Sequence, residues 1–250
     1  MADQSSLRTL DRALWILAHF TRAQPEWGVS DLSRALGLPK SIVQKTLATF
    51  ARWGFLHQDP DTRKYRLGTR FLLMAQLVTF HEELVRVAMP HLKWLAQMTN
   101  ETAKLSVEEA GESVIVAVVE SPLSMRMTGR VGDRNPLYAG ASNQVLAAHL
   151  PWEKVRKALE RNAPPDHPYR KNPESLRIIL EAINRQGYAI SNGEVERDVT
   201  AVSAPVRVST GEVVASVSVV GPTSRLGRAN TDQVVRLVMD GALRISRDLG

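Results

Sequence analysis

The stretch GLPKSIVQKTLATFARWGFL, residues 37–56, decides how the N-terminal third of this chain should fold. Pro39 suits the first turn of a helix and Gly54 marks an end, so the spacing predicts a helix over 39–53. At 100° per residue, one side of this helix is an apolar stripe: Val43, Leu47, Phe50 and Ala51. We expect that stripe to pack against neighbouring helices.

The opposite side of the same helix is polar and contains no acidic residue. It presents Ser41, Gln44, Lys45, Ala48 and Arg52, with Lys40 at the start and Thr49 on a flank. An ordinary solvated basic face is one interpretation. A face that lies in a groove of DNA is the other, because Gln44 has the donor and acceptor that an adenine edge needs. Lys45 and Arg52 have donors for guanine or phosphate oxygens.

The segments around this helix favour the second interpretation. A helix is predicted over 7–22 and a second, with Ser30 as its N-cap, ends at Gly37. Residues 55–67 alternate apolar and polar positions around Asp59, Pro60 and Asp61, which predicts a β-hairpin. Three helices followed by a hairpin is the order of a winged helix-turn-helix. Its wing tip would hold Thr62, Arg63 and Lys64, which we expect to contact the sugar–phosphate backbone.

Basic charge is concentrated in the same part of the chain. Residues 1–80 hold 11 Lys and Arg against 6 Asp and Glu, a net charge of +5, whereas residues 81–250 hold 21 against 20, a net of +1. Such a distribution indicates a polyanionic partner for the N-terminal segment alone.

The remainder of the chain predicts a mixed α and β domain. Residues 69–80 are predicted to form an apolar core helix, which could in addition pack against a second subunit. An amphipathic helix over 84–100 follows, and then a hairpin over 102–121. We further expect a strand over 124–131, a helix with Ser142 as N-cap, helices from Pro151 and over 174–187, a Pro-rich loop over 162–173, strands near 188–192, 199–208 and 213–220, and a C-terminal helix over 230–250.

The sequence resembles the IclR family of bacterial transcriptional regulators over nearly its whole length. The resemblance is carried by LDRALWIL, VSDLSRALGLPKSIVQKTLATFARWGFL and YRLGTRFL in the N-terminal part, and by NPLYAGASNQVLAAHLP, INRQGYAIS and VSAPVRVSTGEVVASVSVVGP in the C-terminal part. It implies an α+β fold with a winged helix-turn-helix over 1–68, a linker helix over 69–83 and a GAF-like α/β effector-binding and oligomerisation domain over 84–250. It also implies homodimers or homotetramers on double-stranded operator DNA.

The resemblance and the helix geometry together give the expected DNA-binding residues: Ser30, Lys40, Ser41, Gln44, Lys45, Thr49, Arg52, Thr62, Arg63 and Lys64. Family recognition helices typically have Thr and Arg where this chain has Ile42 and Lys45. Lysine lacks the bidentate fork of arginine, so we expect a less strict guanine contact and an operator of its own.

Family effector pockets use amides at a loop-to-helix junction and polar side chains on central strands. The positions that correspond here are Met127, Ala141, Ser142, Ser191, Val199, Ala201, Ser218 and Val220. Ser191, Ala201 and Val220 replace an acidic, a thiol and a hydroxyl group of the family, so we expect a less polar pocket and a larger, partly apolar ligand, such as an aromatic carboxylate. Arg126 or Arg130 would meet its charge, unless both are simply solvated.

An enzyme is not favoured, and we expect neither catalytic residues, nor a metal, nor a cofactor. There is no Cys, and the six His residues are scattered. GASNQ around Ser142 lacks the closing glycine of a nucleophile elbow, and the acidic residues Glu194, Glu196 and Asp198 are expected to be solvated. No apolar run reaches transmembrane length, so we expect a cytoplasmic protein. The competing hypothesis is a small-molecule sensor without sequence-specific DNA binding.

Overall fold

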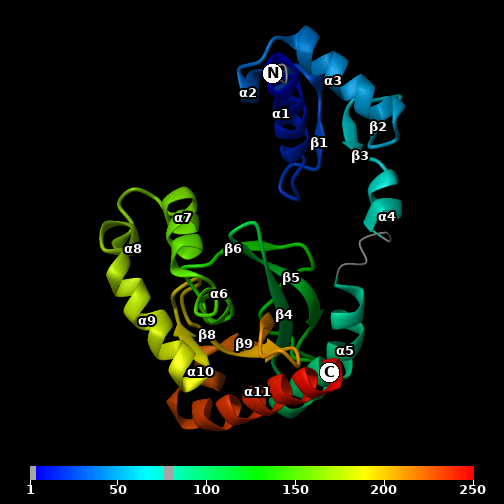
Figure 1. Cartoon of the computed structure of the whole chain (residues 1–250). Helices are drawn as coiled ribbons and strands as arrows, with labels where there is room; N and C mark the ends of the chain where they lie inside the picture. The colour runs from blue at the N-terminus through cyan, green and yellow to red at the C-terminus, as the bar shows by residue number, and fades with distance from the viewer. Residues whose placement is uncertain (1–3, 76–80) are drawn as a thin grey trace. The chain divides into compact units, whose positions relative to one another are not determined.

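The computed structural model describes residues 4–75 and 81–250, which form two compact units (Figure 1). One unit covers residues 1–79 and the other residues 80–250. The division falls inside the predicted linker 69–83, whose exact boundaries remain a prediction.

The N-terminal unit is a winged helix-turn-helix, as predicted. Its helices are α1 (Gln4–Ala18), α2 (Val29–Leu36) and α3 (Lys40–Arg52). A small antiparallel sheet places β3 (Tyr65–Leu67) between β1 (Glu26–Trp27) and β2 (Leu56–Gln58). Helix α4 (Arg70–Ala75) follows; the rest of the predicted linker helix, residues 76–80, lies outside the described residues.

The apolar stripe of α3 is buried, which confirms the predicted orientation of this helix. Val43 and Leu47 are fully buried among Ile16 of α1, Leu32 of α2 and other apolar side chains of the unit. The opposite face of α3 is exposed at each predicted position: Ser41, Gln44, Lys45, Ala48 and Arg52.

Two predicted boundaries in this unit are wrong. Helix α2 begins at Val29 with Gly28 as its N-cap, so Ser30 lies exposed in the first turn and caps nothing. Glycine at the cap leaves the terminal amides without a side-chain acceptor, and Gly28 has extended backbone angles that suit the position. Helix α1 ends at Ala18 and not at residue 22, because the chain turns there and the Trp27 indole donates to the His19 carbonyl at 2.8 Å.

The C-terminal unit is built on one six-stranded antiparallel sheet in the order β6-β5-β4-β9-β8-β7. The strands are β4 (Thr102–Glu109), β5 (Glu112–Val119), β6 (Arg134–Pro136), β7 (Ala189–Asn192), β8 (Val199–Arg207) and β9 (Val213–Pro222). Helices α5 (Glu82–Thr99) and α11 (Arg228–Leu249) cover one face, and α6 (Ala141–Ala147) lies on the other (Figure 1). The predicted α+β class and GAF-like effector fold are confirmed.

Further helices complete the face that α6 covers. They are α7 (Trp152–Asn162), α8 (Pro168–Lys171) and α9 (Pro173–Gln186), while the short α10 (Thr223–Leu226) links β9 to α11. The predicted Pro-rich loop therefore contains one helical turn, at α8. Helix α9 ends at Gly187 with φ 80°, the left-handed conformation that glycine adopts at low cost.

The strand expected over 124–131 is wrong. This segment is irregular, and a short strand forms later, at Arg134–Pro136. Side chains satisfy its backbone in place of a strand ladder: the Thr102 hydroxyl donates to the Met127 carbonyl at 2.6 Å, and Asp133 accepts from the Arg130 amide at 2.9 Å. Ser142 is also not an N-cap, because α6 begins one residue earlier and Gly140, with φ 88°, takes that position.

No helix within residues 4–75 and 81–250 is both long and apolar enough to cross a membrane.

Leu47→Ala should lower the free energy of unfolding of the N-terminal unit by roughly 2–5 kcal/mol, since it removes a fully buried side chain and leaves a cavity. Urea unfolding followed by circular dichroism measures the change. Leu10→Ala is the matched control, because Leu10 is exposed on α1 and its loss should cost less than about 0.5 kcal/mol. Equal losses in the two variants would contradict the assigned orientation of α3.

Candidate DNA-binding surface and effector pocket

The outer face of α3 carries cations that no carboxylate of the described residues neutralises. Lys40, Lys45 and Arg52 are exposed and make no ion pair with any residue in the described part of the chain. Thr49 is exposed too, but its hydroxyl donates to the Lys45 carbonyl at 2.8 Å, so it is partly engaged by its own helix. The face can therefore offer a polyanion one amide side chain, two lysines and an arginine.

The turn between α2 and α3 holds this face in place. Gly37 adopts a left-handed conformation with φ 63°, and the Ser33 hydroxyl donates to the Leu38 carbonyl at 2.6 Å. The Leu38 amide returns a hydrogen bond to the Ser33 carbonyl at 3.1 Å. The role of Ser33 in this turn was not predicted from the sequence. Its position four residues before the helix-ending Gly37 was the one feature that could have indicated it.

The wing is ordered by one carboxylate. Asp59 accepts from the Asp61 amide at 3.0 Å, the Thr62 amide at 2.8 Å and the Thr62 hydroxyl at 3.0 Å. The hydrogen bonds from Thr62 lower the pKa of Asp59, so the carboxylate is charged at neutral pH and holds the turn. Thr62 is thus committed within the wing, whereas Arg63 and Lys64 are exposed at its tip.

Arg63 takes a left-handed backbone conformation, with φ 58°. The Gln58 side chain donates to the Arg63 carbonyl at 3.0 Å, which helps to hold that conformation.

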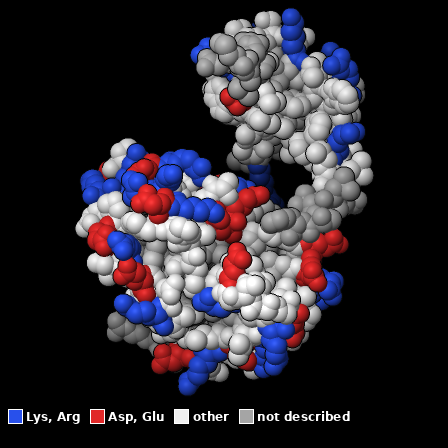
Figure 2. Space-filling model, in the orientation of Figure 1, with Lys and Arg blue, Asp and Glu red and all other residues white. Residues whose placement is uncertain are grey.

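On the visible face of the molecule, Lys and Arg are spread over the N-terminal unit with few acidic residues, whereas residues of both signs alternate over the C-terminal unit (Figure 2).

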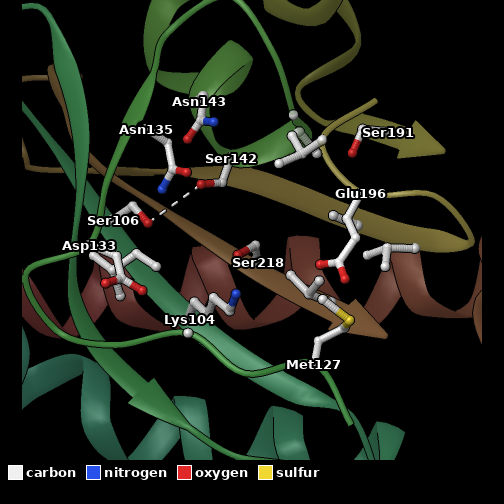
Figure 3. Close-up of a pocket in the computed structure, with 18 of the residues that line it drawn as sticks. Lys104, Ser106, Met127, Asp133, Asn135, Ser142, Asn143, Ser191, Glu196 and Ser218 are labelled. Atoms are coloured by element: carbon white, nitrogen blue, oxygen red, sulfur yellow. Dashed lines mark hydrogen bonds between the residues drawn. The ribbon is translucent and has the colours of Figure 1, made fainter. Parts of the chain in front are cut away.

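All eight predicted effector positions line one cavity of about 360 Å³. Strands β7, β8 and β9 contribute Ser191, Val199, Ala201, Ser218 and Val220, α6 contributes Ala141 and Ser142, and the irregular segment before β6 contributes Met127 (Figure 3). The structure therefore brings together residues that are up to 93 positions apart in the sequence.

Alternation along the strands explains why this cavity is partly polar. On β4, Lys104 and Ser106 face the cavity, while Ala103, Leu105 and Val107 are buried toward α5 and α11. Lys104 pairs directly with Ser218 across β4 and β9. The prediction missed Lys104 and Ser106, although the polar positions in TAKLSV alternate with apolar ones and so indicated a second functional face.

Lys104 lines the cavity and has no ion-pair partner among the described residues. Its side chain is half-buried and points toward Ser218 and the loop that carries Glu196 (Figure 3). Burial lowers the pKa of Lys104, and the charges of Asp133 and Glu196 act in the opposite direction. In the described part of the chain, Lys104 makes no hydrogen bond and no ion pair within 4.0 Å.

Serine side chains complete the polar lining of the cavity. Ser218 is 1% exposed, and its hydroxyl has no partner among the described residues. The Ser142 hydroxyl donates to that of Ser106 at 3.4 Å, as the dashed line in Figure 3 shows. A buried hydroxyl without a partner costs free energy, and a ligand that accepts its hydrogen bond would recover it.

The arginines proposed to meet the effector do not line the cavity, so that expectation is wrong. Arg126 pairs with Glu120 at 2.9 Å, close to it in sequence. Arg134 does line the cavity, but Glu109 at 2.7 Å and Glu112 at 2.9 Å neutralise it. Residues 124–131 form no strand, and of this segment Met127, Thr128 and Gly129 line the cavity while both arginines are exposed.

The acidic loop after β7 is more than a solvated segment. Glu194 accepts from the Gly140 amide at 3.1 Å and from the Gln144 side chain at 3.2 Å, which ties the loop to the start of α6. Glu196, two residues later, lines the cavity. No group of three or more His, Asp or Glu side chains suited to a metal ion occurs within the described residues.

Comparison with known proteins matches each part of the chain to a family model. The model of the IclR helix-turn-helix domain matches residues 9–60, and that of the C-terminal domain of bacterial IclR transcriptional regulators matches residues 76–247. The chain belongs to the IclR family. The members of this family are transcriptional regulators, so the match gives no support to the enzyme hypothesis.

Individual relatives align over the whole chain. The regulator XynR of Escherichia coli is 29% identical with 98% of each chain covered, and KipR of Bacillus subtilis is 27% identical with 99% of each covered. An IclR homologue from Microbacterium hydrocarbonoxydans, solved in complex with 4-hydroxybenzoate, is 29% identical; it has a TM-score of 0.80 and covers 96% of this chain and 98% of its own.

Lys104→Met should raise the melting temperature of the ligand-free protein at pH 7 by roughly 2–4 °C, because it removes an unpaired, partly desolvated charge. The lowered pKa means that the protonated side chain opposes folding below that pKa. The increase in melting temperature should become smaller as pH rises toward 10.5. At that pH lysine loses its proton in the unfolded chain as well, so the charge no longer distinguishes the two states.

Lys93→Met, on an exposed position of α5, is the control and should leave the melting temperature nearly unchanged. Differential scanning calorimetry across this pH range measures both variants. A lower melting temperature for Lys104→Met would show that the ammonium is paired in solution.

Proposed function

We propose that this protein is a ligand-responsive DNA-binding transcriptional regulator that controls a catabolic operon. In this proposal α3 and the wing bind double-stranded operator DNA, and the cavity of the C-terminal unit binds a small organic acid, with an aromatic acid favoured. Sequence-specific DNA binding distinguishes it from a small-molecule sensor that has lost its operator.

The observation that carries the proposal is the exposed, acid-free face of α3. Its Gln44 lies between exposed cations, and Lys45 and Arg52 have no competing intramolecular partner within the described residues. Arginines on several helices of the C-terminal unit pair with a carboxylate of the same helix, as Arg156 does with Glu153 and Glu160. Among the described residues the cations of α3 make no such pair, which leaves them available to a phosphate backbone.

Roles on the DNA follow from the position of each group. Gln44, with Lys45 and Arg52, would contact base edges in the major groove, and Lys40, Ser41 and Thr49 would contact the backbone beside it. Arg63 and Lys64 would contact phosphates through the wing. Thr62 would act mainly by ordering the wing, and Ser30 would contact the backbone from the first turn of α2.

The size and lining of the cavity support a small acid as effector. Its volume of about 360 Å³ lies at the lower end of the range for small-molecule sites. Met127, Val199, Ala201 and Val220 offer apolar contacts, whereas Ser218 and Lys104 offer hydrogen-bond donors. The 4-hydroxybenzoate bound by the Microbacterium homologue has this combination of an apolar ring and a carboxylate.

Exposed apolar residues on α4 support assembly into a homodimer or homotetramer. Leu72, Leu73 and Met74 are 67%, 61% and 48% exposed. Three such neighbours on one short helix are costly in water, so the structure favours a partner subunit over the core-helix alternative. Sedimentation velocity on the intact protein and on Leu72→Asp tests this assignment.

Footprinting on the intergenic DNA beside the gene tests the DNA-binding proposal. A protected site should appear, and the logarithm of its affinity should fall linearly with the logarithm of salt concentration. Arg63→Ala or Lys64→Ala should reduce that slope by about 1 each, while Lys93→Ala, in the other unit, should leave it unchanged. Absence of any protected site, with or without organic acids, would refute the proposal.

Gln44→Ala should change base preference more than overall affinity. Loss of a paired contact to one base costs about 1–3 kcal/mol of discrimination at that position, since phosphate contacts remain. Binding to a library of operator variants, measured at fixed salt, locates the affected base pair. Ser41→Ala removes a proposed backbone contact and should instead weaken binding evenly across the library. The same even weakening for Gln44→Ala would contradict the role of Gln44.

The effector class can be tested by thermal shift. Aromatic acids such as 4-hydroxybenzoate should raise the melting temperature more than small keto acids such as pyruvate, because the apolar lining needs an apolar body to cover. Stabilisation by small keto acids alone would contradict the aromatic preference.

A further inference from the structure

We infer that Lys104 makes the cavity selective for monocarboxylates: its ammonium and the Ser218 hydroxyl bind one carboxylate, while Asp133 and Glu196 exclude a second. The inference rests on the proposed function, because it assigns a ligand class and a selecting residue to the same cavity. None of Lys104, Asp133 and Glu196 was expected from the sequence.

Lys104 is the cation that the cavity offers to a ligand. Four charged residues line the cavity: Lys104, Asp133, Arg134 and Glu196. Arg134 is held by Glu109 and Glu112 on the neighbouring hairpin. Lys104, in contrast, makes no ion pair within the described residues and points into the space between Ser218 and Glu196 (Figure 3).

A second donor lies beside the ammonium. Ser218 and Lys104 face each other on adjacent antiparallel strands, where paired Cβ atoms are about 4.5–5.5 Å apart. Ser218 lines the cavity, and its buried hydroxyl has no partner in the described part of the chain. A carboxylate has two oxygens, so it can accept from both groups at once.

The surrounding backbone makes room for this lysine. A Cβ atom built on Gly129 would lie 2.6 Å from Lys104 Nζ, so no larger residue fits there without displacing the ammonium. The hydrogen bond from the Thr102 hydroxyl to the Met127 carbonyl keeps this part of the chain against β4. The position of Lys104 in the cavity therefore depends on particular neighbours.

The carboxylates of Asp133 and Glu196 limit the ligand's charge. Both act on Lys104 electrostatically, yet neither comes within 4.0 Å of it. One ligand carboxylate at Lys104 leaves these two acids facing the rest of the ligand. A second carboxylate on the ligand would meet like charges there, whereas a hydroxyl could donate to either acid.

Isothermal titration calorimetry on the full-length protein tests the inference. The probes are benzoate, 4-hydroxybenzoate and pyruvate as monocarboxylates, 4-hydroxybenzamide as a neutral analogue, and terephthalate as a dicarboxylate. The wild type should bind the best monocarboxylate roughly tenfold or more tightly than the amide or the dicarboxylate, since hydrogen bonds to charged groups contribute about 1.5–3 kcal/mol.

Three variants separate the roles. Lys104→Met should bind acid and amide equally, whereas the control Lys93→Met should keep the wild-type preference. Gly129→Ala should weaken acid binding without changing any charge, because it displaces the ammonium. Glu196→Gln should bind terephthalate more tightly than the wild type does. The difference in affinity between monocarboxylates and the dicarboxylate should therefore become smaller.

The inference is overturned if Lys104→Met keeps the preference for acid over amide, if terephthalate binds more tightly than the monocarboxylates, or if no monocarboxylate binds the wild type. Circular dichroism verifies folding of each variant; should Lys104→Met not fold, the effect of Glu196→Gln on terephthalate decides. These outcomes leave operator protection unaffected, whereas a missing protected site refutes the proposed function and leaves the preference for acid over amide intact.

Discussion

The pairing of β4 with β9 is the interaction on which the C-terminal unit depends, because it gives one sheet two chemically different faces. Ala103, Leu105, Val217 and Val219 pack toward α5 and α11 and supply the core. On the opposite face, the same two strands carry Lys104, Ser106 and Ser218. A register shift of one residue would exchange the faces, burying a charge in the core and placing valines in the cavity. Folding and ligand binding thus depend on the same register.

The N-terminal unit uses the equivalent device on a helix. Val43 and Leu47 anchor α3 in a small core, and this burial leaves Gln44, Lys45 and Arg52 on the outside. The helical period fixes that partition: any rotation of α3 that exposes Leu47 also moves the cations toward the core. In both units, therefore, the apolar half of an element determines where its polar half can act.

Periodic features could be predicted from the sequence, and features set by tertiary contacts could not. The apolar stripe of α3, the hairpins and the left-handed Gly187 follow from local pattern, and the family resemblance placed Ser191, Ala201 and Ser218 on one cavity. The irregular segment before β6 was misassigned because side chains far away in sequence, such as Thr102, satisfy its backbone. The same error led to the wrong cation being expected in the cavity. Arg126 pairs with Glu120, and Lys104 lines the cavity instead. The predicted starts of α2 and α6 were wrong because a glycine, Gly28 or Gly140, stands at the N-cap position in place of a capping side chain.

The hydrogen bonds of Asp59 have a consequence for the speed and energetics of association. They hold the turn of the wing, with Arg63 in its left-handed conformation, before any partner arrives. A loop that is already ordered loses less conformational entropy on binding than one that must fold onto its partner. Under the proposed function, long-range attraction between the basic unit and a phosphate backbone would act on this preformed shape, which favours rapid encounter.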